Sequence, residues 1–337
     1  MISIVIPVYN SMDYIGECLD SLEKQQDSVF EIVLVDDGST DGSGEYCDNY
    51  AYNKENVKVI HQKNRGQQAA RAEGVRRSAG DYIMFLDSDD CLREDALRII
   101  SETFRHGAYD VVCFDYSRGN RQNYETGVLG GDLLQPGDYS GERYKEVLRT
   151  LCSGQFNNLV TKAIRRNLAI EALSTLEGNA GLRHGEDLMY LIPVISNARS
   201  LCCLPDVLYF YRDNPSSVTG AFSSFQIGDL GVVFTSLVRK AAIWGGDCPL
   251  IAKNASVKHF FWALMSLSKS GLPDYRKVGY AREIAEEVRS VCGNDAGSIV
   301  TSMRLDFAIP MKLLMSGRSR LALMCASLIC SLTNVRK

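Results

Sequence analysis

Three aspartates follow a short apolar run in the segment Phe85-Leu86-Asp87-Ser88-Asp89-Asp90. Hard divalent cations prefer oxygen ligands, and Mg²⁺ is commonly held by one or two carboxylates together with the phosphates of a substrate. Two aspartates separated by one residue, Asp87 and Asp89, could therefore hold a metal-bound diphosphate. The alternative is structural, since acidic residues in a turn also favour the start of the helix that follows Leu92.

A second acidic group, Val35-Asp36-Asp37-Gly38-Ser39, stands at the end of another apolar run. The carboxylate of Asp37 could accept hydrogen bonds from the N–H group of a base or from a ribose hydroxyl. A plain turn before a helix that starts near Thr40 would use the same residue types.

Basic residues follow in Asn64-Arg65-Gly66 and at Arg71. A guanidinium group can bind a diphosphate through two parallel hydrogen bonds, so Arg71 is a candidate for contact with a nucleotide. A cation on the surface of a helix is the alternative interpretation of this residue.

A further acidic pair, in Gly185-Glu186-Asp187-Leu188, opens an apolar helical stretch. A carboxylate at the start of a helix is kept ionised by the positive end of the helix dipole. Such a carboxylate, here that of Asp187, is of the type that can act in proton transfer. An ordinary acidic pair that caps the helix is the alternative.

These residues need a scaffold that brings several strand ends together. Strands are predicted at residues 2–8, 31–35, 57–60, 82–86 and 111–116, and helices at residues 13–22, 67–79 and 94–106. This alternation predicts a mostly parallel sheet with helices on both faces, in which ligands bind beyond the carboxyl ends of the strands. Residues 117–139 are predicted to form a loop or irregular hairpin over the site, and the chain beyond Phe222 is predicted to be mostly helical.

Composition narrows the class of protein. The 337 residues are 45% hydrophobic and 23% charged, which suits a globular protein of about two domains. The net charge of −4 argues against a nucleic-acid-binding protein, which normally has an excess of basic residues. The 11 cysteines form no CxxC pair, so we expect reduced, buried thiols in a cytoplasmic protein. Neither a signal peptide nor an apolar run of about 20 residues is seen.

Taken in order over residues 2–95, these motifs resemble the family-2 glycosyltransferases, which have the GT-A fold. The matching segments are Val5-Ile6-Pro7-Val8-Tyr9-Asn10, residues 35–41, Asn64-Arg65-Gly66 with Ala70-Arg71, and the DxD segment Asp87-Ser88-Asp89-Asp90. Their ordered co-occurrence is far more specific than any one motif. A dinucleotide-dependent oxidoreductase is disfavoured, because Tyr9-Asn10-Ser11-Met12 stands where a glycine-rich turn would be needed.

The resemblance implies an inverting transferase of the hexosyltransferase type. It would move a sugar from a nucleoside-diphosphate donor, expected to be a UDP-sugar, to a hydroxyl group of a saccharide or lipid-linked acceptor. Synthesis of a cell-surface polysaccharide is the expected context. The donor-binding residues that the resemblance implies are Pro7, Tyr9, Asn10, Asp37, Arg71, Asp87, Ser88 and Asp89.

The resemblance also implies individual roles. The backbone around Pro7 and the ring of Tyr9 would flank the base, Asp37 would contact the base, and Arg71 would lie near the nucleotide. Asp87 would lie near the ribose. Asp89 would bind the Mn²⁺ or Mg²⁺ ion that bridges the diphosphate. Asp187 would be the catalytic base, and Arg212, in Tyr209-Phe210-Tyr211-Arg212, is a candidate for contact with the diphosphate. An edge strand with a turn at Asn214-Pro215 is the alternative for that segment.

The expected organisation is a GT-A domain at residues 1–220, with a nucleotide-binding half at 1–116 and an acceptor half at 117–220, followed by a helical region at 221–337. Within that region, residues 305–332 combine apolar and basic side chains. This segment is too short to span a bilayer. It suits a helix at a membrane surface, and a core or subunit-contact helix of a homodimer is the alternative.

The expected location is the cytoplasm, with peripheral contact at the inner face of the plasma membrane. The competing function is a catalytically silent relative that binds a nucleotide or a partner protein. Both DxD carboxylates and the acid at position 187 are present, which argues against a silent relative.

Overall fold

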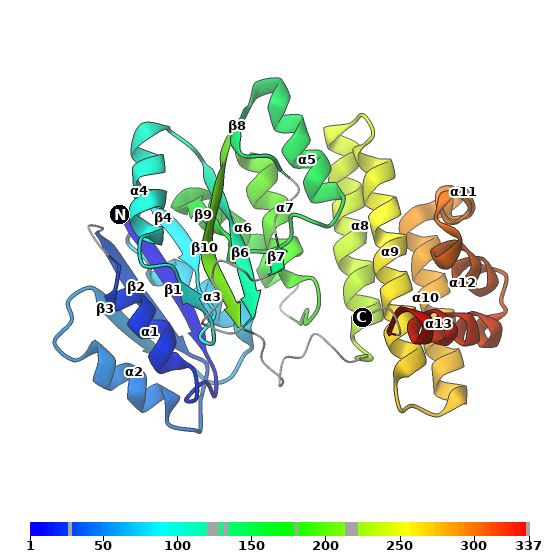
Figure 1. Cartoon of the computed structure of the whole chain (residues 1–337), viewed down its shortest axis with the longest axis horizontal. Coiled ribbons are helices and arrows are strands. Elements are labelled where there is room, and N and C mark those ends of the chain that lie inside the picture. Colours follow the sequence, from blue (N-terminus) through cyan, green and yellow to red (C-terminus); the bar gives the residue numbers. More distant parts are fainter. Residues whose placement is uncertain (26–28, 120–127, 131–133, 179–180, 213–221, 335–337) are drawn as a thin grey trace. The chain divides into compact units, whose positions relative to one another are not determined.

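The computed structural model describes residues 1–25, 29–119, 128–130, 134–178, 181–212 and 222–334, and it divides into two compact units. The first unit comprises residues 1–147, 155–180 and 190–215 and contains the sheet. The second comprises residues 148–154, 181–189 and 216–337 and is helical (Figure 1). The predicted α/β class with a helical C-terminal region is confirmed. The turn expected at Asn214-Pro215 lies outside the described residues.

The elements follow the predicted order in the first 116 residues, with ends that shift by three residues or fewer. The strands are β1 (Ile2–Val8), β2 (Phe30–Asp36), β3 (Val57–His61), β4 (Tyr82–Phe85), β5 (Cys91–Leu92), β6 (Val111–Gly119), β7 (Val128–Gly130), β8 (Gly137–Ser140), β9 (Lys162–Arg165) and β10 (Ser200–Arg212). The helices before residue 200 are α1 (Ile15–Glu23), α2 (Ser43–Ala51), α3 (Gln67–Arg77), α4 (Ala96–His106), α5 (Tyr144–Cys152), α6 (Arg166–Glu177) and α7 (Glu186–Asn197). The later helices are α8 (Gln226–Trp244), α9 (Cys248–Lys269), α10 (Asp274–Cys292), α11 (Ala296–Ser302), α12 (Leu305–Met315) and α13 (Ser319–Asn334).

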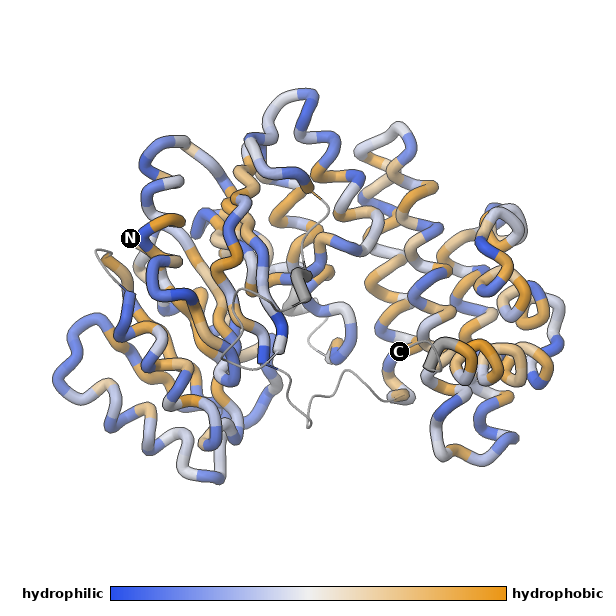
Figure 2. The backbone as a smooth tube through the Cα atoms, viewed as in Figure 1, coloured by the Kyte–Doolittle hydropathy of each residue, from blue (hydrophilic) through white to orange (hydrophobic). Residues whose placement is uncertain are grey.

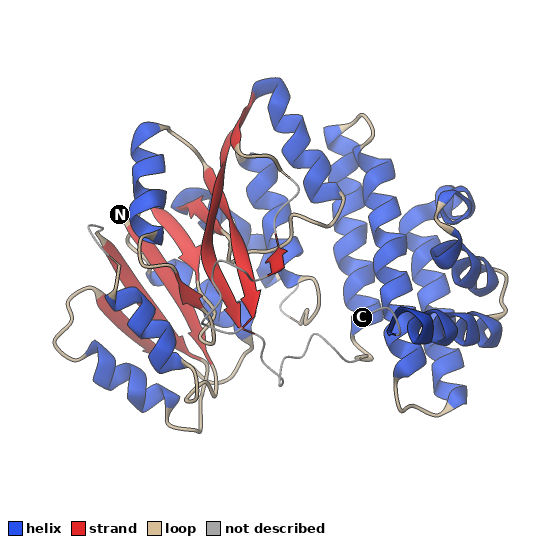
Figure 3. Cartoon of the chain, in the orientation of Figure 1, coloured by secondary structure: helices blue, strands red, loops and turns tan. Residues whose placement is uncertain are grey.

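The sheet has the strand order β3-β2-β1-β4-β9-β6-β10-β5, with β7 beside β6 and β8 beside β10 (Figure 3). Strands β1 to β4 are parallel, and β6 and β10 are parallel to each other. Strand β9 is antiparallel to both of its neighbours and separates these two parallel groups. The sheet therefore contains more antiparallel pairing than the mostly parallel sheet that was predicted. The antiparallel pair of β6 and β7 agrees with the hairpin expected in residues 117–139, although residues 120–127 and 131–133 lie outside the described part.

Helices cover both faces of the sheet, as predicted. Helices α3 and α6 pack on one face, and α1 and α4 lie on the other (Figure 1). Every residue of β1 is buried, and all but Ser3 are apolar, as expected for a strand covered on both faces (Figure 2). Gly74 lets α3 approach β1 closely, because a Cβ atom there would lie 2.3 Å from Cγ1 of Val5. This close packing fixes the position of Arg71, which lies one turn earlier in α3.

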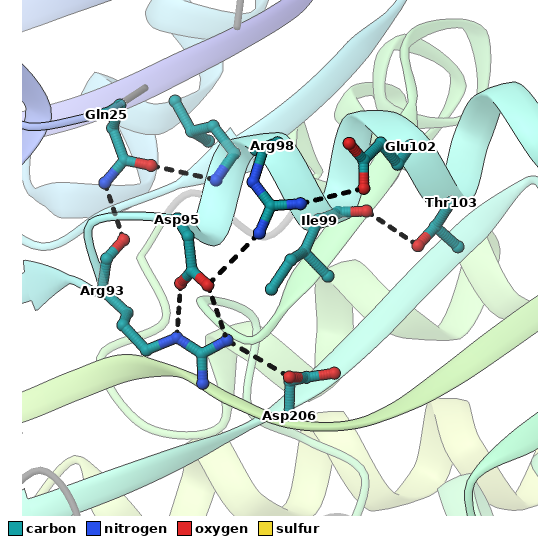
Figure 4. A network of polar contacts seen from close by, with 9 residues as sticks. Gln25, Arg93, Asp95, Arg98, Ile99, Glu102, Thr103 and Asp206 are labelled. Carbon is teal, nitrogen blue, oxygen red and sulfur yellow. Dashed lines mark hydrogen bonds and ion pairs between the residues drawn. The ribbon is translucent and has the colours of Figure 1, made fainter. Parts of the chain in front are cut away.

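A polar network anchors the chain just after the DxD segment (Figure 4). The guanidinium of Arg93 pairs with Asp95 at 2.5 Å and with Asp206 of β10 at 3.2 Å. The amide of Gln25 donates to the carbonyl oxygen of Arg93 at 2.7 Å and accepts from the backbone N–H of Leu97 at 3.0 Å. These contacts fix the short strand β5 between α1, α4 and β10. Because β5 directly follows the DxD segment, they also fix the C-terminal end of that segment.

The second unit is built from α8 to α13, which confirms the helical prediction beyond Phe222. Helix α9 packs against α8 and α10, and α13 packs against α9, α10 and α12. Its core is formed by fully buried side chains such as Phe234, Phe260 and Leu264. Within the described ranges, no helix combines the length and the apolar character that a membrane span needs.

Candidate functional site

The carboxyl ends of the first four strands lie at one edge of the sheet. Val8 of β1 stands in register with Asp36 of β2, and Asp36 stands in register with His61 of β3. The backbone N–H of Asp37 donates to the carbonyl oxygen of Val8 at 2.8 Å. Strand β4 pairs with β1 from the other side, so the DxD segment begins at the same edge. The segments after β1, β2 and β4 therefore share one edge, as the parallel pattern predicts.

The loop after β1 is tied to the loop after β2. Asn10 adopts a positive φ of 48°, which asparagine tolerates better than most residues. Its backbone N–H donates to the hydroxyl of Ser39 at 3.1 Å, and its side-chain oxygen accepts from the backbone N–H of Thr40 at 2.8 Å. Tyr9, next to these hydrogen bonds, is 51% exposed, whereas Pro7 is buried in β1. The edge thus presents one exposed aromatic ring on a fixed loop.

Asp37 is buried at 2% exposure, and its carboxylate holds the loop that follows β3. It accepts hydrogen bonds from the side chain of Gln62 at 2.7 Å, the N–H of Arg65 at 2.8 Å and the N–H of Gly66 at 2.7 Å. A carboxylate offers about four acceptor positions, so these three bonds use most of its capacity. The predicted contact of Asp37 with a base stays a prediction, and the structure adds a role in holding the loop.

His61 lies between two carboxylates at the same edge. Its Nδ1 atom is 2.9 Å from Asp36, and its Nε2 atom is 2.9 Å from Asp48 of α2. The hydrogen bonds with Asp36 and then Asp48 raise the pKa of His61 above its ordinary value. The protonated ring can donate to both carboxylates at once, whereas the neutral ring can donate to only one.

The stability of the protein should fall modestly as the pH rises through the folded-state pKa of His61. The folded-state pKa lies above the unfolded value of about 6.5, so this contribution is fully present below that pH and is lost above the folded pKa. Because the His61 side chain is 48% exposed, we expect a loss of less than about 1 kcal/mol. Urea denaturation at pH values from 6 to 8.5 measures it. A His61→Gln variant that kept the same pH dependence would contradict the assignment.

Arg71 and Asp87 form a pair beside the DxD segment. The guanidinium of Arg71 lies 2.8 Å from the carboxylate of Asp87, which also accepts from the amide of Gln67 at 3.0 Å. Arg71 is only 6% exposed and lies over the ring of Phe85 at 5.8 Å. The alternative of a surface cation is therefore wrong for Arg71, and the pair holds the Asp87 carboxylate in one orientation.

Asp90 joins the DxD segment to β10. The hydroxyl of Tyr209 donates to the carboxyl of Asp90 at 2.5 Å, and the backbone N–H of Arg212 donates to it at 2.8 Å. Burial, and then the charges of Asp87 and Asp89, raise the pKa of Asp90 to about 8. Sequence reasoning assigned no role to Asp90 or Tyr209, because nothing in the sequence indicated that residues so far apart would pair.

Arg212 lies directly against the DxD segment. Its Nε–H donates to the carbonyl oxygen of Asp89 at 2.9 Å, and its guanidinium pairs with Glu17 of α1. On the other side of the segment, the hydroxyls of Ser88 and Ser11 share a hydrogen bond of 2.7 Å. The structure therefore brings Arg212 and Ser88 to the predicted site, while contact of Arg212 with a diphosphate stays a prediction.

Asp187 lies in the first turn of α7, where it was predicted. Gly185 precedes the helix with a φ of 79°, and a Cβ atom there would lie 3.2 Å from Val233 of α8. The carboxylate of Asp229 in α8 accepts from the backbone N–H groups of Arg183 and His184, at 3.0 and 3.1 Å. The start of α7 is thus fixed within the helical unit. The role of Asp187 as a base stays a prediction.

The comparisons with known proteins agree with this arrangement. Residues 3–169 match the model of the family described as glycosyl transferase family 2. This part of the chain belongs to glycosyl transferase family 2. The resemblance seen in the sequence is therefore confirmed.

Two curated relatives of the family-2 region are glycosyltransferases by name. The uncharacterized glycosyltransferase EpsJ of Bacillus subtilis (strain 168) is 32% identical over 221 residues, which are 65% of this chain and 63% of EpsJ. The poly(ribitol-phosphate) beta-glucosyltransferase of Bacillus spizizenii is 47% identical over 134 residues, which are 39% of this chain and 19% of that protein. The matched part of this chain thus spans less than two thirds of each relative.

One solved structure has a fold that matches this chain over nearly its whole length. Residues 1–349 of S. aureus TarS, in complex with UDP-GlcNAc, match with a TM-score of 0.72. The match covers 96% of this chain and 90% of the TarS chain at 19% sequence identity. At this identity the match shows a shared fold.

The acidic side chains of the family-2 region fit a divalent cation. Among the side chains that the structure describes, no three His, Cys, Asp or Glu residues are arranged to hold a metal ion. A Mg²⁺ ion that is also bound by substrate phosphates needs only one or two carboxylates from the protein. Asp89 and Asp87 follow one strand end and are the carboxylates that could meet that requirement, with Asp87 already paired with Arg71. Their charges already raise the pKa of Asp90, which indicates a concentration of negative charge that a cation would offset.

Proposed function

We propose that this chain transfers a sugar from a nucleoside-diphosphate donor to a hydroxyl group of an acceptor, with inversion at the anomeric carbon. The observation that carries the proposal is the DxD segment at the carboxyl edge of the sheet in a family-2 region. The TarS structures with UDP-GlcNAc and UDP support a UDP-sugar as the donor. The name of the poly(ribitol-phosphate) relative supports a hydroxyl-bearing polymer as the acceptor. A saccharide or lipid-linked acceptor in cell-surface polysaccharide synthesis stays part of the proposal.

The edge of the sheet supplies groups for each part of the donor. The exposed ring of Tyr9 is suited to stack on the base, while the remaining acceptor position of Asp37 is suited to a base N–H. Asp87, which pairs with Arg71, would accept a hydrogen bond from a ribose hydroxyl.

Asp89 is the residue proposed to hold Mn²⁺ or Mg²⁺, with Asp87 beside it. A bound cation stabilises the negative charge that develops on a departing diphosphate. Arg212, fixed on the carbonyl of Asp89, adds a positive charge at the same segment. In this proposal the diphosphate would lie between a cation bound at Asp89 and the guanidinium of Arg212. Both would offset its negative charge.

Asp187 is proposed to take the proton from the acceptor hydroxyl. An inverting transfer needs a single base on the face opposite the leaving group, and its transition state resembles an oxocarbenium ion. No covalent nucleophile is needed. Asp187 lies in the first turn of α7, at the positive end of the helix dipole.

A screen of sugar nucleotides by thermal shift tests the proposal. With Mn²⁺ present, we expect at least one UDP-sugar at saturating concentration to raise the melting temperature by about 3 °C or more. Mn²⁺ alone and the UDP-sugar with a chelator are the controls. Release of UDP from the same sugar nucleotide should follow. Binding without UDP release or transfer would instead favour the catalytically silent alternative, and absence of any nucleotide-dependent shift would refute the donor site.

A further inference from the structure

The last helix of the chain exposes a row of large apolar side chains. The side chains of Leu321, Met324, Leu328 and Leu332 in α13 are 48%, 67%, 63% and 62% exposed. Their spacing of three and four residues places them on one face of the helix, which we call the apolar stripe. Figure 2 shows how strongly hydrophobic α13 is along its described length.

The apolar stripe takes no part in the core of the helical unit. The opposite face of α13 is buried against α9, α10 and α12, through Ala322, Leu323, Ala326 and Cys330. On the neighbouring helix α12, Leu305 and Ile309 are also exposed, at 74% and 47%. These two helices carry six of the 18 exposed large apolar side chains among the described residues. Such a concentration marks an interaction surface more often than chance exposure does.

The charge of this segment differs in sign from the charge of the whole chain. Residues 304–334 contain four basic residues and one acidic residue, a net charge of +3, whereas the whole chain carries −4. The other residues therefore carry −7. Arg304 pairs with Asp306, and the remaining cations Lys312, Arg318 and Arg320 are exposed. Arg318 and Arg320 lie at the start of α13, beside the first residue of the apolar stripe.

We propose that the apolar stripe docks on an anionic lipid surface, with α13 lying in the plane of the interface. A helix with one apolar face and basic residues near its end binds such surfaces through apolar burial and attraction to acidic headgroups. A second copy of the chain fits the stripe less well, because a symmetric contact would bring two basic segments together. This docking goes beyond sugar transfer and does not depend on it.

Vesicle flotation of the full chain tests the proposal. We expect the protein to float with phosphatidylcholine vesicles that contain roughly 30% phosphatidylglycerol, and to float much less with phosphatidylcholine alone. Met324→Glu/Leu328→Glu should lower binding at least about tenfold, because two buried apolar contacts are replaced by charges that the surface repels. Arg318→Gln/Arg320→Gln should lower it roughly 25-fold, at about fivefold for each cation.

The matched control is Ile243→Glu/Leu250→Glu, which makes the same charge change at side chains that are 76% and 52% exposed in α8 and α9. It should float like the wild type, and circular dichroism should show that all variants fold. Failure of the wild type to bind the anionic vesicles would overturn the proposal, as would an equal loss in the control. Light scattering that shows a dimer split by Met324→Glu/Leu328→Glu, without vesicle binding, would assign the stripe to a second copy instead.

Discussion

An Asp187→Asn variant should lose sugar transfer almost completely while it still binds the donor nucleotide. The amide has nearly the same shape as the carboxylate but cannot take a proton, and a positioned general base typically contributes a factor of about 100 to 10,000. Asp187 lies in the first turn of α7 and is not in the buried core, so the substitution should leave the fold intact. Release of UDP in the presence of acceptor measures the loss in kcat.

The neighbouring residue Glu186 offers a matched control, because it lies in the same helical turn and has the same charge. Glu186→Gln should keep kcat within a few fold of the wild type. Calorimetric titration with UDP and Mn²⁺ should give the same affinity for both variants and the wild type. A kcat for Asp187→Asn close to that of the wild type would remove this residue from the role of base.

Replacing Asp89 by asparagine should weaken Mn²⁺-dependent donor binding by about 100-fold and lower the rate of transfer at least as much. The neutral amide is a poorer ligand for a hard cation, and loss of the cation removes its stabilisation of the diphosphate. Calorimetric titration of the protein with UDP, with and without Mn²⁺, measures the effect apart from activity.

The control for this substitution lies at the opposite end of the same strand. Asp81 precedes β4, its side chain is 75% exposed, and it pairs with the N-terminal amine at 2.9 Å. Asp81→Asn should leave both the affinity for UDP and its dependence on Mn²⁺ unchanged. Unaltered Mn²⁺ dependence in the Asp89→Asn variant would show that the cation is held elsewhere.

Mostly apolar runs were sufficient to predict β1, β2 and β4, because these strands are buried and their side chains are largely apolar. Strand β3 at the end of the sheet is partly exposed, and its run is broken by Lys58. Parallel pairing then predicted that the residues after β1, β2 and β4 would share an edge. Strand β5 was not predicted, because two residues are too few to reveal a period. Strand β9 was not predicted, because its four residues begin with Lys162 and end with Arg165 and so form no apolar run. The antiparallel β9 is the reason that the sheet is more mixed than expected.

The contacts within the site were harder to predict than its position. Asp37 was expected to face a ligand, but most of its hydrogen-bonding capacity is used by the loop after β3. Arg212 pairs with Glu17 across 195 residues, and Tyr209 pairs with Asp90 across 119 residues. Such partners depend on the register of β10, which no local pattern in the sequence specifies.

The bond between Asp90 and Tyr209 has an evolutionary consequence. The chain from Cys91 to Leu208 runs between these two residues, and it includes surface segments as well as strands of the sheet. Because Asp90 is held directly by β10, a change of length in one of those surface segments need not move Asp90. Under the proposed function, a lineage could recruit new acceptors by remodelling surface segments of that interval while Asp187 and the donor-binding residues before Cys91 are kept. The two bracketing positions themselves should change only together.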